Sequence, residues 1–162
     1  MIASAGGGLS FFPNWNSAFG QIQSPGMLLS MGAWDATAFG NDDAVDWAAE
    51  LVEADKPVEL LKRTFALADG DGYLEAPDGS QLVAAAAVVA AAISGKTPQS
   101  FPEAISRWLY GKADPLKGLA ATAVAALQRV KGDDSELREL WKESEAFPAW
   151  ESDLDSILAV LG

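Results

Sequence analysis

The chain has 162 residues, of which 49% are apolar and 21% are charged, so it is long enough to build one hydrophobic core and we expect a single folded domain. It carries 23 acidic and 11 basic residues, which gives a formal net charge of -12. This balance argues against binding to nucleic acid, which needs clustered lysine and arginine to neutralise phosphates. It argues equally against binding to an anionic membrane surface.

Histidine and cysteine are both missing from the sequence. Their absence excludes imidazole bases, thiol nucleophiles, disulfides and the usual structural zinc sites. We therefore expect no cofactor. A chain without disulfides suits a reducing compartment, and we expect a cytoplasmic protein.

The first 30 residues carry no charged side chain. They contain neither the basic start nor the continuous apolar stretch of a secretory signal. We expect residues 1–30 to form a flexible appendage, Met31 to be the biological start, and residues 31–162 to form one helical domain.

Residues 43–55 show the clearest helical pattern of the chain. At about 100° per residue, the positions of the acids and those of the apolar residues fall on separate faces. The acids are Asp42, Asp43, Asp46, Glu50 and Glu53, and the apolar residues are Ala44, Val45, Trp47, Ala48, Leu51 and Val52. We expect Asn41 or Asp42 to cap the helix, because short polar side chains accept hydrogen bonds from the free N–H groups of the first turn.

Two further helices are expected before the middle of the chain. The first begins at Pro57, since proline fits the first turn of a helix, and ends near Ala68. The second is Leu82–Ile93, which is apolar on every side and contains seven alanines, so that neighbouring helices can approach it closely. At about 1.5 Å per residue this run spans about 18 Å, well short of a bilayer core of about 30 Å, and we expect a buried central helix.

The second half of the chain continues the helical pattern. The expected helices are Pro102–Tyr110, about Pro115–Lys131, one that starts with a capping box of Asp133 and Glu136, and a last one opened by Pro148. The last two carry apolar stripes of Leu137, Leu140 and Trp141, and of Trp150, Leu154, Ile157 and Leu161. Because no segment shows the sustained alternation of a strand, the sequence predicts an all-α bundle of about six or seven helices around the alanine-rich helix.

Charge is distributed unevenly along the chain. Residues 31–80 carry a net charge of -9, residues 81–132 carry +4, and residues 133–162 carry -7. Such blocks are typical of solvated outer faces that partly neutralise one another in the fold. The alternative is an acidic surface that binds a basic partner.

Two segments resemble ligand-binding loops without matching them. Asp69, Asp71, Tyr73, Glu75 and Asp78 suggest calcium, but Leu74 and Ser80 occupy the loop positions where the EF-hand needs glycine and glutamate. Gly95-Lys96-Thr97 lacks the earlier glycine of a phosphate-binding loop. We expect a polar turn at the first segment and a glycine helix cap at the second.

Asp42, Asp46 and Glu50 are spaced at i, i+4 and i+8 and could hold magnesium, manganese or calcium. The opposite face of this helix is cleanly apolar, which favours a solvated acidic face over a metal site. We expect no metal here.

The aromatic residues are expected mainly in the core. Trp47, Trp108, Trp141 and Trp150 each lie in an apolar stripe and would fill volume around the alanine-rich helix. An exposed binding anchor is the alternative. Trp34 and Phe39 are expected to fold back onto the start of the first helix.

Several of these segments together resemble a bacterial family known as domain of unknown function 4259. The likeness lies in Met31-Gly-Ala-Trp, Phe39-Gly-Asn-Asp-Asp-Ala-Val-Asp-Trp, Leu74-Glu-Ala-Pro-Asp, the alanine-rich helix that ends near Gly95, and Ser135-Glu-Leu-Arg-Glu-Leu-Trp followed by Trp150. It covers about residues 31–161. The resemblance implies a small helical domain and brings no catalytic residue with it.

The sequence favours a non-enzymatic interaction protein, such as an inhibitor or immunity-type protein. Its acidic helix, through Asp42, Asp43, Asp46, Glu50 and Glu53, would bind a basic protein partner. One alternative is a carboxylate-based metalloenzyme that uses Asp42, Asp46 and Glu50 or the Asp69–Asp78 loop. Another is a homo-oligomeric structural protein, because the sequence leaves the oligomeric state open.

Overall fold

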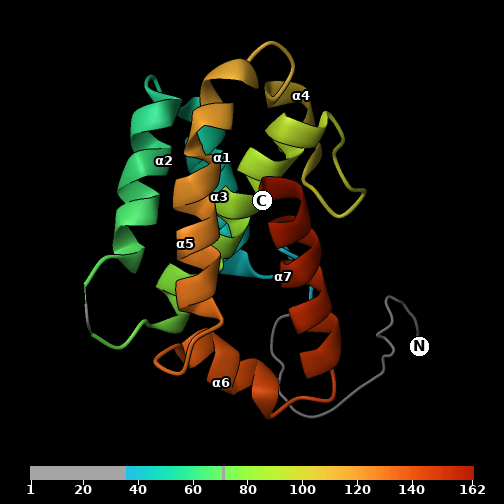
Figure 1. Cartoon of the computed structure of the whole chain (residues 1–162). Helices are drawn as coiled ribbons and strands as arrows, with labels where there is room; N and C mark the ends of the chain where they lie inside the picture. Colours follow the sequence, from blue (N-terminus) through green and yellow to red (C-terminus); the bar gives the residue numbers. More distant parts are fainter. Residues whose placement is uncertain (1–35, 71) are drawn as a thin grey trace. The chain divides into compact units, whose positions relative to one another are not determined.

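The helices of the chain surround one buried helix, as the computed structural model shows (Figure 1). The structure describes residues 36–70 and 72–162. The predictions for residues 1–30, Met31 and Trp34 lie outside this range. The elements in chain order are α1 (Asp42–Glu53), α2 (Pro57–Phe65), the 3-10 helix η1 (Ala66–Ala68), α3 (Ala76–Ser94), α4 (Glu103–Trp108), the 3-10 helix η2 (Asp114–Leu119), α5 (Ala120–Val130), α6 (Glu136–Lys142) and α7 (Phe147–Leu161).

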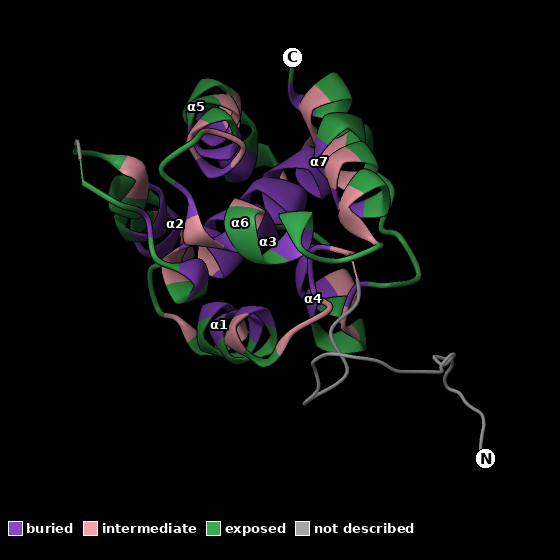
Figure 2. Cartoon of the chain, turned by 90° about the horizontal axis from the view of Figure 1, so that it is seen from below, coloured by how far each residue is buried: buried purple, intermediate pink, exposed green. Residues whose placement is uncertain are grey.

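This arrangement confirms the predicted all-α bundle. The described residues contain seven α-helices, and their sole β-type pairing is an isolated parallel bridge between Leu74 and Ser135. Helix α3 contacts α1, α2, α5, α6 and α7, so it is the central element. Seen from below, its buried residues form the middle of the bundle, and the other helices turn their exposed sides outward (Figure 2).

Helix α1 follows its sequence pattern closely. The side chain of Asn41 accepts a hydrogen bond from the Ala44 N–H at 2.9 Å, which confirms the predicted cap. The buried residues are Ala44, Trp47, Ala48 and Leu51. Val45 was expected on the apolar face but is 46% exposed. It lies at the edge of that face, about 60° from Asp42 around the helix, so the bundle does not cover it.

Helix α3 starts earlier than the sequence predicted. It begins at Ala76 rather than Leu82, because Pro77 fits the first turn and the carboxylate of Glu136 accepts a hydrogen bond from the Ala76 N–H at 2.7 Å. At its end, Gly95 takes the left-handed conformation with φ +73°, which confirms the predicted glycine cap.

The true length of α3 also corrects the prediction about membranes. With 19 residues the helix is long and apolar enough to cross a bilayer, so the argument from a short run was wrong. However, 78% of its most apolar window is buried inside the bundle. In the described part of the chain it is therefore the core helix of the fold.

Two predictions about α6 were wrong in detail. Its cap is Ser135, whose hydroxyl accepts a hydrogen bond from the Arg138 N–H at 3.3 Å, and not Asp133. The side chain of Glu136 is directed to α3 and therefore does not complete a capping box. Leu140 is 45% exposed because the short helix covers the bundle only with Leu137 and Trp141.

Candidate interaction surface

The five acids predicted as a binding site all lie on α1. Asp42, Asp46, Glu50 and Glu53 are exposed, and Asp43 is half-buried. The opposite side of the helix packs on α3 through its buried apolar residues. The predicted separation of the two faces is thus present, apart from Val45, and we call the four exposed acids the acidic strip.

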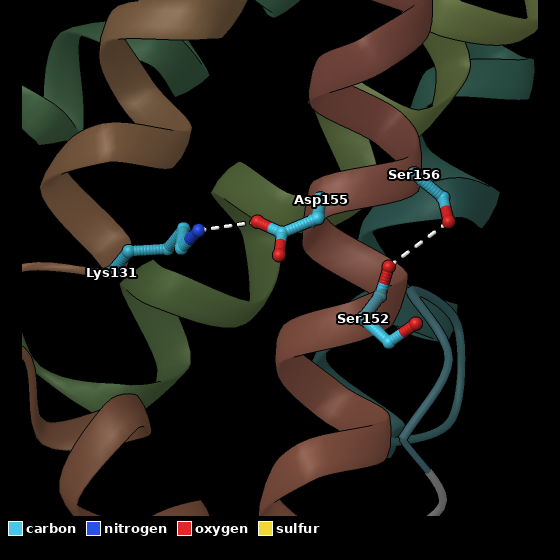
Figure 3. A network of polar contacts seen from close by, with 4 residues as sticks. All are labelled: Lys131, Ser152, Asp155 and Ser156. Carbon is cyan, nitrogen blue, oxygen red and sulfur yellow. Dashed lines mark hydrogen bonds and ion pairs between the residues drawn. The ribbon is translucent and has the colours of Figure 1, made fainter.

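The acidic strip forms no ion pair with the described part of the chain. Within residues 36–70 and 72–162, none of the five α1 carboxylates takes part in an ion pair. The four ion pairs of this range involve other acids: Arg107–Glu103, Lys117–Asp114, Arg138–Asp133 and Lys131–Asp155. The last pair joins the end of α5 to α7, where Ser156 also donates a hydrogen bond to the Ser152 carbonyl (Figure 3).

The position of the strip along α1 has an energetic cost. Acids in the first turn, Asp42 and Asp43, are favoured by the helix macrodipole. Glu50 and Glu53 lie in the last turn, where the dipole is negative and where α1 has no basic residue. Acids spaced at i, i+3 and i, i+4 also repel one another by about 0.2–0.5 kcal/mol per pair. Glu50 and Glu53, at the C-terminal end of the strip, therefore lower the stability of the free helix.

The C-terminal half of the strip borders an open groove at the corner between α1 and α2. The groove has a volume of about 970 Å³. Its lining residues are Glu50, Glu53, Ala54, Asp55, Lys56, Glu59, Leu60 and Arg63. Four carboxylates and two cations line this groove, so its overall character is acidic while Lys56 and Arg63 offer sites for an anion as well.

A second acidic region of the fold is organised differently. We call it the clip, because it fastens the loop before α3 to the start of α6. It comprises Gly72, Tyr73, Leu74 and Ala76 on one side and Arg129, Asp134, Glu136 and Glu139 on the other.

Backbone and side chains both contribute to the clip. The Leu74 N–H donates to the Asp134 carbonyl at 2.7 Å, and the Glu136 N–H donates to the Leu74 carbonyl at 2.8 Å. Arg129 donates to the carbonyls of Gly72 and Asp134. The carboxylates of Glu136 and Glu139 also accept hydrogen bonds from the opposite side of the clip, and they therefore help to hold distant segments together.

The pKa of Tyr73 reflects the negative charges of the clip. Its hydroxyl donates a hydrogen bond to the Glu139 carboxylate at 2.8 Å. This hydrogen bond, together with some desolvation and the negative charges of Glu139, Glu136 and Asp134, raises the pKa of the Tyr73 phenol to about 12. The phenol is stabilised in its protonated form because ionisation would place another negative charge beside these acids.

The candidate metal sites do not assemble in the described residues. Across residues 36–70 and 72–162, no three acidic side chains gather closely enough to hold a metal ion. Asp42, Asp46 and Glu50 are spread along the outside of α1, and Glu75 and Asp78 belong to the start of α3. Asp71 lies outside the described range.

The four predicted core tryptophans are buried. Trp47, Trp108, Trp141 and Trp150 are at most 7% exposed. Trp47 on α1 donates from Nε1 to the Thr64 hydroxyl of α2 at 2.8 Å, and this hydroxyl donates to the Leu60 carbonyl. This chain of hydrogen bonds satisfies the buried indole and fixes α1 against α2.

One exposed aromatic residue was not identified from the sequence. Tyr110 follows α4 and is 86% exposed, the largest value among the exposed large hydrophobic residues that the structure describes. Two residues on, the amine of Lys112 lies 5.3 Å from the ring centre of Trp108. The one available signal was Tyr110-Gly111, because glycine after a bulky residue at a helix end marks a sharp turn.

Comparison with curated proteins and with solved structures finds no match to this chain. One family does match, over residues 32–153. This span includes α1, the groove, the clip and the first part of α7, and it ends before the predicted limit at residue 161. The chain therefore belongs to the family described as Domain of unknown function (DUF4259).

Proposed function

We propose that this protein is a non-enzymatic interaction protein, of the inhibitor or immunity type, whose acidic strip binds a basic protein partner. The observation that carries the proposal is that the strip has no ion-pair partner among the described residues. A partner that brings lysine or arginine to Asp46, Glu50 and Glu53 would supply the missing counter-charges.

The energetic cost of the strip supports the same proposal. Glu50 and Glu53 weaken α1 in the free protein, and the fold gains nothing from them in return. In a complex with a basic partner, the attraction of these two acids to the partner's cations would outweigh their unfavourable interaction with the helix dipole. Stability given up in the free state is a frequent consequence of a binding function.

The groove between α1 and α2 gives the strip a concave extension. A partner side chain placed there would meet the acids Glu50, Glu53, Asp55 and Glu59 around the apolar Leu60. The stem of a lysine or arginine can lie along apolar surface while its charged head reaches a carboxylate. This combination suits a long basic side chain.

The test is affinity purification from the native host with three forms of the protein. These are the wild type, the strip variant Glu50→Lys/Glu53→Lys, and the control Glu143→Lys/Glu145→Lys, which makes the same change of charge at two exposed acids after α6. We expect the wild type and the control to retain a basic protein and the strip variant to lose it. Retention should fall between about 0.05 and 0.5 M salt, because exposed charges are screened.

Two results would contradict the proposal. One is that no basic protein is retained at either salt concentration. The other is that the strip variant and the control retain the same proteins equally well. Far-ultraviolet circular dichroism of each variant confirms that the helices are intact.

A further inference from the structure

The dipeptide Asp-Gly occurs in two very different environments of the described fold. Asp69-Gly70 follows the 3-10 helix η1, and Asp78-Gly79 lies in the first turn of α3. A third such pair, Asp71-Gly72, begins with a residue outside the described range. In an Asp-Gly pair the backbone nitrogen of glycine can approach the aspartate carboxyl group with little hindrance, because glycine has no Cβ. The two described pairs therefore show what the fold does to the same local chemistry.

The first pair is open to solvent. Asp69 and Gly70 are both exposed. Gly70 has a φ of +100°, and a Cβ added there would meet no heavy atom within 4 Å. Among residues 36–70 and 72–162, no group accepts a hydrogen bond from the Gly70 N–H. The Gly70 nitrogen is thus neither packed nor hydrogen-bonded within this part of the chain.

The second pair is held by the helix and by its packing. The Gly79 N–H donates a hydrogen bond to the Glu75 carbonyl at 2.9 Å. Gly79 is buried, and a Cβ added there would lie 3.2 Å from the Cβ of Leu137. Turning the Gly79 nitrogen toward the side chain of Asp78 would break this hydrogen bond and disturb the contact between α3 and α6.

We infer that Asp69-Gly70 is a site of spontaneous isoaspartate formation in the folded protein, and that the fold protects Asp78-Gly79 from the same reaction. The Gly70 nitrogen attacks the carboxyl carbon of the protonated Asp69 side chain. The N–H proton and the carboxyl OH leave as water, and a five-membered cyclic imide remains. Water then opens the imide at the main-chain carbonyl, so that the peptide linkage runs through the side-chain carbon and the α-carboxylate of Asp69 is free. Water is the only co-reactant, and mass is unchanged.

Ring closure requires a change of backbone conformation at Asp69. Its ψ of 151° has to rotate until the Gly70 nitrogen faces the side chain. The hydrogen bond from the Asp69 N–H to the Ala66 carbonyl, at 3.0 Å, lies before this rotating bond and can stay intact. Gly70 absorbs the change, since glycine adopts both signs of φ readily. In the first turn of α3 the equivalent rotation would unwind the helix.

The product is compatible with the fold. Isoaspartate lengthens the main chain by one carbon in the loop that leads to Gly72 and Tyr73 of the clip. Small extensions of an exposed loop cost little free energy. The site lies outside the acidic strip, so the inference is independent of the proposed function.

The test is peptide mapping of the full chain after incubation in neutral buffer, both folded and unfolded in urea. Digestion at mildly acidic pH, followed by electron-transfer fragmentation, assigns isoaspartate separately to residues 69, 71 and 78. In the folded protein we expect isoaspartate to accumulate at residue 69 at least about tenfold faster than at residue 78, because local opening of a packed helix is rare. In urea the two rates should become similar.

A pair of matched variants connects the product to its residue. Asp69→Glu keeps the carboxylate but would need a six-membered imide, so it should abolish isomerisation at residue 69. Asp78→Glu should leave the rate at residue 69 unchanged. Equal rates at residues 69 and 78 in the folded protein, no isoaspartate at residue 69, or a difference that persists in urea would each overturn the inference. Far-ultraviolet circular dichroism verifies the folded and unfolded states.

Discussion

The acidic strip and the clip are both rich in carboxylates, but carboxylates of the clip are hydrogen-bonded within the fold and those of the strip form no ion pair with the described residues. In the clip, Glu136 accepts the N–H of Ala76 and Glu139 accepts the hydroxyl of Tyr73. On α1, Asp46, Glu50 and Glu53 have no ion-pair partner among the described residues. Composition alone therefore does not distinguish acids that build the structure from acids that remain available for binding. The two kinds of acid are distinguished by whether hydrogen-bond donors lie next to them in the fold.

The largest loss of stability is expected for a substitution at Gly79, where α3 packs against α6. A Cβ added at Gly79 would lie 3.2 Å from the Cβ of Leu137, which is tied to the backbone of α6. Gly79→Val should therefore push α6 away and lower the free energy of unfolding by about 3 kcal/mol. The control is Gly118→Val, since an added Cβ at Gly118 meets no heavy atom within 4 Å. Chemical denaturation of both variants measures the difference, and equal losses would contradict the packing argument.

The next largest loss of stability is expected when the carboxylate of Glu136, which caps α3, is removed. Glu136→Ala removes the acceptor of the Ala76 N–H, which leaves a helix N-terminus without its cap. We expect the free energy of unfolding to fall by about 1–2 kcal/mol. Glu143→Ala, which removes an exposed acid nearby, should change it by less than about 0.5 kcal/mol. A loss for Glu136→Ala no larger than for Glu143→Ala would show that the clip does not stabilise the fold.

Removing charge from the C-terminal end of the acidic strip should raise stability rather than lower it. Glu50→Gln/Glu53→Gln removes two negative charges from the C-terminal turn of α1 and should raise the free energy of unfolding by about 0.5–1 kcal/mol. Within the same helix, Asp42→Asn removes a favourable charge from the first turn and should lower it by about 0.3–1 kcal/mol. Thermal unfolding at low salt gives both values. Destabilisation by the double variant would mean that the strip does contribute to the fold.

The sequence was most informative where the relevant physics is local. The period of α1, its Asn41 cap and the apolar alanine-rich run each depend on neighbouring residues, and all three are present in the structure. The clip depends on contacts between residues about 60 positions apart, such as Ala76 with Glu136. Because local patterns do not reveal that long-range cap, the sequence predicts the start of α3 too late. For the same reason it predicts Glu136 in a capping box of its own helix.

The site shows the same division between local and tertiary information. Which face of α1 carries the acids follows from helical period alone. That Val45 is exposed, and that α4 packs against α1, follows from how the helices pack. Short elements such as α4 and α6 carry too few residues for a period to define their buried side, and Leu140 was misplaced for this reason.

The smallest effect, and the most specific one, is the ionisation of Tyr73 in the clip. The chain has two tyrosines, so in a Tyr110→Phe background the absorbance of phenolate reports Tyr73 alone. We expect its pKa at about 12, against an ordinary value of 10.0, because the hydrogen bond to Glu139 favours the protonated phenol. Adding Glu139→Gln should move the pKa down toward the ordinary value.

The raised pKa of Tyr73 determines how the stability of the protein changes with pH. Because the pKa of Tyr73 is raised in the folded state, its contribution to stability is complete below pH 10 and is lost as the pH rises toward 12. The slope of stability against pH in this window should therefore flatten when Glu139→Gln is introduced. If the pKa of Tyr73 were the same with and without the Glu139 carboxylate, the side-chain half of the clip would be absent in solution, and the contrast with the acidic strip would rest on the backbone pairing and Glu136 alone.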